Sequence, residues 1–302
     1  MAVNASESWK SEIAIGTPGS GWGTPGTVDF RLDDFEDPSI IMAPVYVERM
    51  GSRGTRNEYR ANVGGKATQG DINGFCATPN IMAKVLHLAM GSRSGTTISL
   101  IDGNVPVFTM EQNRAGVQGY TYAGCKIATF SMSYAPNENV KCSYSIVARK
   151  EIQTAVGSLT SVSYDTESPY QFYEVTITID GVTRDLYGLN FSIDNNLLYP
   201  EFVSGNQFPK CPGEGVRTIT GNFSREHIAE DLYNKFQSGT LAKIVASGSN
   251  GTDTMVITFD TIQYREYTRD KGDQKETESV GFTAIAADSG ATPQMTATVT
   301  TS

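Results

Sequence analysis

The stretch ATFSMSYAPNENVKCSYSIVA, residues 128–148, decides the fold class of this chain. Apolar and polar residues alternate along both of its ends, and its centre, residues 136–139, is rich in proline and asparagine. Alternation with a period of two places one set of side chains on one face of a strand, and proline with asparagine favours a turn. The stretch therefore predicts a hairpin of residues 128–134 and 140–148 with one buried face.

Two Asp-Gly dipeptides predict further hairpin turns. Residues 175–179 alternate and end at Asp180-Gly181, a dipeptide that tolerates the positive φ angles of a tight primed turn. Residues 98–100 meet Asp102-Gly103 in the same way. Both sites are therefore expected to join adjacent antiparallel strands.

Only two segments have a helical pattern, and both are short. Residues 78–90 begin with Thr-Pro, carry one apolar face and stop at Gly91. In residues 224–238, Ser224 is the expected N-cap and Gly239 the expected stop. His87 and His227 fall within these segments and are interpreted as packing or surface residues.

Several features recur at an offset of about half the chain, which indicates a tandem duplication. Residues 70–72 (GDI) match 221–223 (GNF), and residues 45–48 match 191–194 in pattern. The two expected helices, residues 78–90 and 224–238, follow these motifs at a similar offset. We therefore expect a mainly β (β+α) chain: an N-terminal extended arm over 1–38, then two tandem β-sandwich or barrel units, 39–155 and 156–302, each with one short helix.

Composition excludes several function classes. The chain has 302 residues and a formal net charge of −9, so its surface is expected to repel nucleic acid. It holds two histidines, and its four cysteines include no CxxC pair, which argues against a catalytic or metal centre. We expect reduced, buried cysteines, no cofactor or metal, and no enzymatic activity. Residues 64–67 (GGKA) depart from a phosphate-binding loop and are interpreted as a surface loop.

Membrane and secretion segments are not expected either. No apolar run approaches the roughly 20 residues that a spanning helix needs. The first twenty residues carry Glu7, Lys10 and Glu12 and lack the apolar centre of a signal peptide. The sequence thus predicts no membrane partner and folding in a cytoplasm.

Five motifs, taken in their order along the chain, resemble one protein family. Residues 15–18 read IGTP, 23–27 read GTPGT, 122–126 read YAGCK, 193–197 read IDNNL and 213–221 read GEGVRTITG. The first two resemble the N-terminal GTP signature of the tail tube proteins, or major tail proteins, of long-tailed bacteriophages. The third resembles the strand that closes the first unit in that family, and the last two resemble the start of the second unit.

The resemblance implies a structural virion protein. Such proteins join their sheets into rings around a channel, and the rings stack into a tube through which genomic DNA passes without specific binding during ejection into the host. A duplicated chain would form a trimeric, pseudo-hexameric ring, with a hexameric ring as the alternative. The implied partners are further copies, tail terminator and tail tip proteins. The implied location is the virion tail, after assembly in the host cytoplasm.

A second function class stays open, and two groups of residues are candidate contacts. A pair of β-sandwich modules that bind carbohydrate or decorate a virion surface would share much of this pattern. A basic cluster stands out in the acidic chain and is interpreted as a loop that contacts the next ring, or as a solvated loop: Arg49, Arg53, Arg56 and Arg60. Trp22 and Phe30 are the expected apolar anchors of the N-terminal arm.

Overall fold

The computed structural model describes most of the chain and confirms its mainly β character. The described residues are 11–17, 19, 21–32, 34–36, 38–47, 61–114, 116–155, 159, 162, 164–272, 275–286 and 294–301. Within them, no helix has the length and apolar character required to cross a membrane. Arg49, Arg53, Arg56 and Arg60 lie outside this part of the chain.

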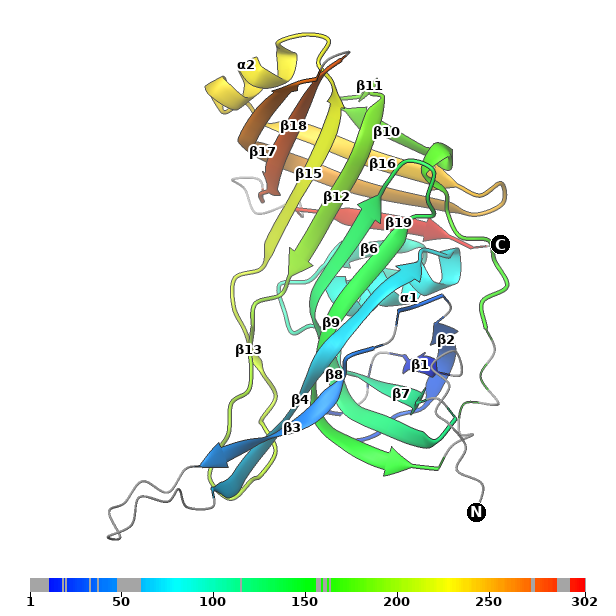
Figure 1. Cartoon of the computed structure of the whole chain (residues 1–302), viewed down its shortest axis with the longest axis vertical. Helices are drawn as coiled ribbons and strands as arrows, with labels where there is room; N and C mark the ends of the chain where they lie inside the picture. The colour runs from blue at the N-terminus through cyan, green and yellow to red at the C-terminus, as the bar shows by residue number, and fades with distance from the viewer. Residues whose placement is uncertain are drawn as a thin grey trace, which may run out of the picture.

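The first half of the chain builds a sheet with the strand order β2–β1–β7–β8–β9–β4–β3, all antiparallel. Helix α1 follows β4, and the hairpin β5–β6 follows α1 (Figure 1). The elements are β1 (Glu12–Gly16), β2 (Val28–Leu32), β3 (Ile41–Val47), β4 (Asn62–Cys76), α1 (Pro79–Met90), β5 (Gly91–Ser94), β6 (Thr97–Leu100), β7 (Phe108–Arg114), β8 (Gln118–Tyr134) and β9 (Lys141–Thr154).

The second half repeats this arrangement with the order β11–β10–β16–β17–β18–β15–β12. Helix α2 follows β15, which pairs with β12, just as α1 follows β4, which pairs with β3. The elements are β10 (Val175–Ile179), β11 (Val182–Thr183), β12 (Leu186–Asp194), β13 (Leu197–Leu198), β14 (Gly213–Glu214), β15 (Thr218–Glu226), α2 (Asp231–Ser238), β16 (Ala242–Ser249), β17 (Thr254–Lys271), β18 (Glu276–Ala284) and β19 (Thr296–Thr300).

Strand registers give a residue-by-residue correspondence between the halves. Gly70 in β4 lies opposite Ile146 in β9, and Gly221 in β15 lies opposite Phe282 in β18. These are the two glycines that the sequence pattern matched, at an offset of 151 residues. Both glycines are required because a Cβ would collide with a neighbouring strand, at the backbone of Ile40 or at the ring of Phe282.

One part of the sequence match is wrong. Gln69, just before Gly70, pairs with Ile41 in β3, and Thr220, just before Gly221, pairs with Ser192 in β12. Ile41 and Ser192 are again 151 residues apart. The match of residues 45–48 with 191–194, at an offset of 146, therefore misaligns these strands. A match of four residues is too short to fix the alignment, and β3 also carries a register shift between Pro44 and Tyr46.

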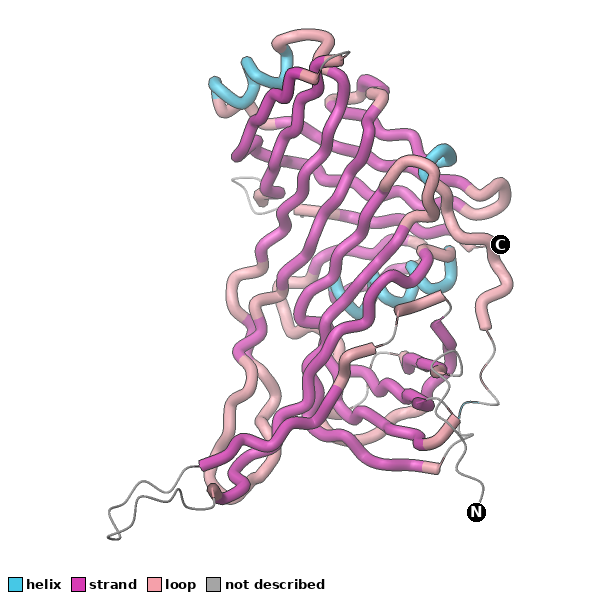
Figure 2. The backbone as a smooth tube through the Cα atoms, in the orientation of Figure 1, coloured by secondary structure: helices cyan, strands magenta, loops and turns pink. Residues whose placement is uncertain are grey.

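The two halves are joined into one continuous sheet (Figure 2). Strand β12 pairs with the second part of β8, from Leu189 opposite Tyr134 to Asp194 opposite Thr129. We call this pairing the joint. It yields an eight-strand run, β17–β18–β15–β12–β8–β9–β4–β3. Among the described residues, no strand pairs with the outer edge of β3 or with that of residues 263–271 of β17. A second connection runs from β6 through β19 to β17.

The expected hairpin of residues 128–148 is confirmed. Met132 lies opposite Cys142 and Phe130 opposite Tyr144, and these four side chains are buried. The turn at Asp180 and Gly181 is also confirmed, since both have positive φ and join β10 to β11. The turn predicted at 102–103 is wrong, because β6 pairs with β5 and β19 and not with the strand that follows.

The two helices differ in how they attach to the sheet. Helix α1 matches its prediction, with Thr78 at the N-cap and Gly91 in the left-handed conformation at its end. Its apolar face is buried: Ile81, Met82, Val85, Leu86 and Ala89. Helix α2 ends at Gly239 as expected but begins at Asp231, because Ser224 belongs to β15. Among α2 residues only Leu232 is buried, so other contacts must hold this helix.

Three further expectations need correction. Strands β1 and β2 pair with each other at the edge of the first sheet, where the sequence predicted an extended arm. Gly64 and Lys66 lie in strand β4 and not in a surface loop. All four cysteines are free, but Cys211 is exposed, whereas Cys76, Cys125 and Cys142 are buried as expected.

Candidate functional site: the polar face of the joined sheet

The joined sheet has one apolar and one polar face. Phe130 and Met132 on β8, with Phe191 and Ile193 on β12, point into the core. The alternating residues point to the opposite side and are mostly hydroxyls and amides: Thr129, Ser131, Ser133, Ser143, Ser145, Asn190, Ser192, Thr220 and Asn222. We call this side the polar face. It extends across both halves because the joint keeps the alternation in register.

Hydrogen bonds across strands tie the polar face together. The Thr129 and Ser145 hydroxyls lie 2.7 Å apart, and those of Ser192 and Thr220 lie 3.2 Å apart. Asn190 donates its side-chain amide to the Asn222 carbonyl at 3.3 Å. Such cross-strand pairs stabilise a sheet and leave short, fixed side chains at its surface.

A hollow of about 610 Å³ lies on the polar face and spans the joint. Its lining includes three charged residues, Glu36, Lys141 and Glu266, among many hydroxyls and amides. Its aromatic lining residue, Phe191, is only 3% exposed, whereas a carbohydrate site stacks sugars on exposed rings. The lining holds neither histidine nor cysteine, and the described residues contain no metal-binding group.

Charges on the polar face are few and mainly negative. The strands place the carboxylates of Asp71, Asp194, Glu266 and Asp270 on this side, and Lys141 lines the hollow. Phosphate binding by proteins depends on lysine and arginine that displace counterions. The polar face therefore offers polyanions a hydrated surface with little attraction.

The connection from β12 to β15 and the β3–β4 hairpin extend side by side beyond the polar face. Tyr199, in the connection from β12 to β15, donates to the carbonyl of Ala148 at 2.8 Å and accepts from the Thr68 amide at 2.7 Å. The Lys66 amide donates to the Gln207 carbonyl at 2.9 Å. The connection thus supports the β3–β4 hairpin. Exposed apolar side chains occur along both segments: Val45, Tyr46, Val47 and Val63 in the hairpin, and Leu198, Phe202, Val203 and Val216 in the connection.

The two expected anchors of the N-terminal segment contact the body of the protein. Trp22 donates its indole N–H to the carbonyl of Pro209 at 3.1 Å, and its own carbonyl accepts from Arg149 at 3.1 Å. The Phe30 ring packs against the core, with the Lys84 ammonium 5.1 Å from its centroid. These residues thus attach β1–β2 and its linker to both halves.

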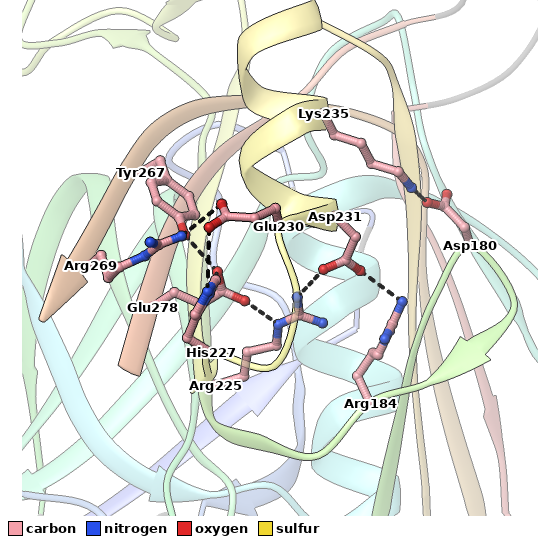
Figure 3. Close-up of polar contacts among 10 residues, drawn as sticks. All are labelled: Asp180, Arg184, Arg225, His227, Glu230, Asp231, Lys235, Tyr267, Arg269 and Glu278. Carbon is pink, nitrogen blue, oxygen red and sulfur yellow. Dashed lines mark hydrogen bonds and ion pairs between the residues drawn. The ribbon is translucent and has the colours of Figure 1, made fainter. Parts of the chain in front are cut away.

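An ion-pair cluster that the sequence did not predict holds α2 to the second half (Figure 3). Glu278 on β18 is completely buried and accepts from Arg225 Nε at 2.5 Å and from the Tyr267 hydroxyl at 2.7 Å. Arg225 also pairs with Asp231, which accepts from Arg184 at 2.9 Å. The cluster comprises Asp180, Arg184, Arg225, His227, Glu230, Asp231, Lys235, Tyr267, Arg269 and Glu278.

The neighbouring guanidinium groups favour the ionised form of Asp231. Burial would raise the pKa of Asp231, but the hydrogen bond and charge of Arg225, with Arg184, lower it overall. Burial and the hydrogen bond to Glu278 raise the pKa of Tyr267, so its hydroxyl keeps its proton. His227 precedes α2 and contacts Glu278 through Nδ1 at 3.1 Å, which corrects its expected place inside a helix. The cross-strand pairing of Arg225 with Glu278 exists only in the folded sheet.

The fold defines a mainly β protein whose sheet continues across both halves. The phage tail tube protein family model matches residues 8–284, nearly the whole chain. The chain therefore belongs to the phage tail tube protein family, as its motifs indicated. No curated protein matches it. The family indicates a structural, non-enzymatic role in the virion tail, with copies of the chain and other tail components as partners.

Proposed function

We propose that three copies of this chain close into a ring with six similar β units, and that stacked rings form the tail tube. The observation that carries this proposal is the strand order, which is the same in both halves and continuous across the joint. Because each half supplies the same run of strands, one chain occupies two neighbouring positions of a six-unit ring. The two end strands of the eight-strand run are then joined to other copies.

The polar face is proposed as the wall of the channel. Short hydroxyl and amide side chains keep the wall hydrated, and its scattered carboxylates repel the phosphates of DNA. DNA would pass without specific contacts during ejection into the host. The opposite face is buried in the core, so it is not available for this role.

Stacking of rings is proposed to use the paired connections at the end of the β3–β4 hairpin. Their exposed valine, leucine and aromatic side chains form an apolar surface that a neighbouring ring would cover. The arginine cluster of residues 49–60 follows β3 directly in sequence. We propose that Arg49, Arg53, Arg56 and Arg60 pair with carboxylates of the next ring. Tail terminator and tail tip proteins would cap the tube, which would assemble in the host cytoplasm.

The arginine proposal has its own test. Arg53→Glu with Arg56→Glu should leave the melting temperature of the lone subunit near that of the parent, since pairs between rings add nothing to it. Tubes should be shorter or absent at low salt, because each contact recurs in every subunit and is screened over roughly 10 Å at 0.1 M salt. Parent-like tubes at low salt would show that the cluster is a solvated feature.

Electron microscopy of the purified protein tests the ring itself. Top views should show closed rings with approximate six-fold appearance and true three-fold symmetry, and side views should show stacked rings. Six whole chains per ring would refute the pseudo-hexamer. A dispersed, folded monomer under all assembly conditions would refute the tube proposal.

A further inference from the structure

The two ends of the eight-strand run are unpaired strands. Strand β17 pairs with β16 as far as Ile262, and from Gln263 to Lys271 its only described partner is β18. Strand β3 pairs with β4 and has no described strand on its other side, where the Ile40 carbonyl accepts from Arg114 and the Met42 amide donates to Glu151. Figure 1 shows β17 and β3 at opposite ends of the sheet. Unpaired edges invite pairing with another chain, which at β3 would replace the bonds that Arg114 and Glu151 make to this edge.

The joint shows what covers the equivalent edges inside one chain. Strand β8 corresponds to β17. The first part of β8 pairs with β7 and the first part of β17 pairs with β16; past a β-bulge, β8 continues along β9 and β17 continues along β18. Strand β12 corresponds to β3, since both pair with the strand that precedes the helix. In the joint, the second part of β8 pairs with β12. The open edges of β17 and β3 are therefore the two sides of a second, unformed joint.

We infer that β17 of one copy pairs antiparallel with β3 of the next copy, in the register of the joint. Thr129 corresponds to Glu266, because each is the first paired residue after the β-bulge of its strand. Asp194 corresponds to Ala43, because the offset of 151 residues between Gly70 and Gly221 also separates these two residues. Transferring the joint register places Ala43 opposite Glu266 and Ile41 opposite Thr268. This inference deepens the proposed ring, on which it rests, by naming the strands and the register that close it.

The side-chain pattern fits this register. Tyr267 and Arg269 lie on the core side of β17, where Met42 and Ile40 of the next copy would meet them, as Phe130 and Met132 meet β12 in the joint. The residues of β8 and β12 on the core side are buried by the joint, whereas Arg269 is exposed. A second copy would cover its aliphatic stem.

Helix α2 leaves room for the added strand. It contacts β17 through Tyr233 and Phe236, which pack on Tyr267 on the core side of the sheet. Helix α1 lies against β8 in the first half, where β12 is nevertheless paired. The second half also lacks a hairpin equivalent to β5–β6, because β16 follows α2 after only residues 239–241. The contact between copies therefore rests on one strand pairing, whereas the joint has the additional β6–β19 connection.

Disulfide crosslinking tests the register. In a Cys211→Ser background, which removes the exposed thiol, one chain carries Ile41→Cys and another carries Thr268→Cys, and the two are assembled together and oxidised. Directly opposite residues in an antiparallel pair have Cα atoms about 4.5–5.5 Å apart, within disulfide range, whereas diagonal neighbours are about 7–8 Å apart. We expect the pair to crosslink about tenfold faster than a pair displaced by two residues, Ile41→Cys with Asp270→Cys.

A matched control comes from the joint itself. Ser131 and Ser192 occupy the positions that correspond to Thr268 and Ile41, and they lie opposite each other in one chain. Ser131→Cys with Ser192→Cys should therefore give an internal disulfide and a monomer on a non-reducing gel, while Ile41→Cys with Thr268→Cys gives a covalent dimer. Circular dichroism confirms that each variant is folded.

The outcomes separate this inference from the proposed function. Rings or tubes in which the displaced pair crosslinks faster, or in which neither pair crosslinks, would overturn the register and leave the tube role intact. Folded chains that never assemble would overturn both. Dimers through the Ile41 and Thr268 positions, in rings of parent appearance, establish the pairing.

Discussion

The ion-pair cluster under α2 supports a quantitative prediction. Glu278 is 0% exposed and Arg225 is 2% exposed, so replacing Glu278 with glutamine leaves a buried guanidinium with Asp231 as its remaining carboxylate. Breaking a buried ion pair by removing one partner costs about 3–5 kcal/mol. Because Asp231 still pairs with Arg225, we expect about 3 kcal/mol, at the lower end of that range.

A surface pair provides the matched control. Lys141 and Glu138 are 2.9 Å apart, and each side chain is 50% exposed. Exposed pairs contribute about 0–1 kcal/mol, so Glu138→Gln should scarcely change the free energy of unfolding. The contrast between the two glutamine variants isolates burial, because the chemical change is the same.

Urea and thermal unfolding measure the difference. At about 2 °C per kcal/mol for a chain of this size, Glu278→Gln should melt roughly 6 °C lower, and Glu138→Gln within about 2 °C of the parent. Replacing both Arg225 and Glu278 with methionine should cost less than Glu278→Gln alone, since no buried charge is left unpaired. Equal stabilities of the two glutamine variants would refute the role assigned to the buried pair.

Three further predictions concern other contacts. Asp231 has a lowered pKa, so its contribution to stability is present above the unfolded value of about 3.9 and is lost as pH falls below it; urea midpoints of Asp231→Asn should therefore fall less than those of the parent below about pH 4. Gly221→Ala should cost about 1–3 kcal/mol in chemical unfolding because its Cβ would meet the Phe282 ring, whereas Gly103→Ala meets only ordinary contacts and should cost far less. Lys126, 1% exposed and 2.8 Å from Glu214, ties β8 to β14, and Lys126→Met should lower the free energy of unfolding by about 3 kcal/mol; a loss under 1 kcal/mol would contradict this.

Much of the fold could be predicted from local patterns in the sequence. The hairpin of residues 128–148 follows from its alternation and its turn, and the turn at Asp180 and Gly181 follows from residues that accept positive φ. Helix α1 follows from its proline start, apolar face and terminal glycine. The family followed from the order of short motifs. The signals for the hairpin, the turn and the helix lie within a few residues of the structure that they predict.

Pairings between distant residues decided the rest. Ser224 has the chemistry of an N-cap, but it pairs with β12 and β18, so α2 starts later. The dipeptide at 102–103 has the chemistry of a hairpin turn, but β6 finds its partners in β5 and β19. Arg225 and Glu278 are 53 residues apart and meet only across the sheet.

The sequence by itself determined the class of protein and the elements with strong local patterns, and it predicted a duplicated organisation. The tertiary structure alone decided the register between the halves, because alternation repeats every two residues and cannot select one alignment. It also decided which edges lack a neighbour within the described part of the chain, those of β3 and of residues 263–271 of β17, because strand neighbours come from distant segments.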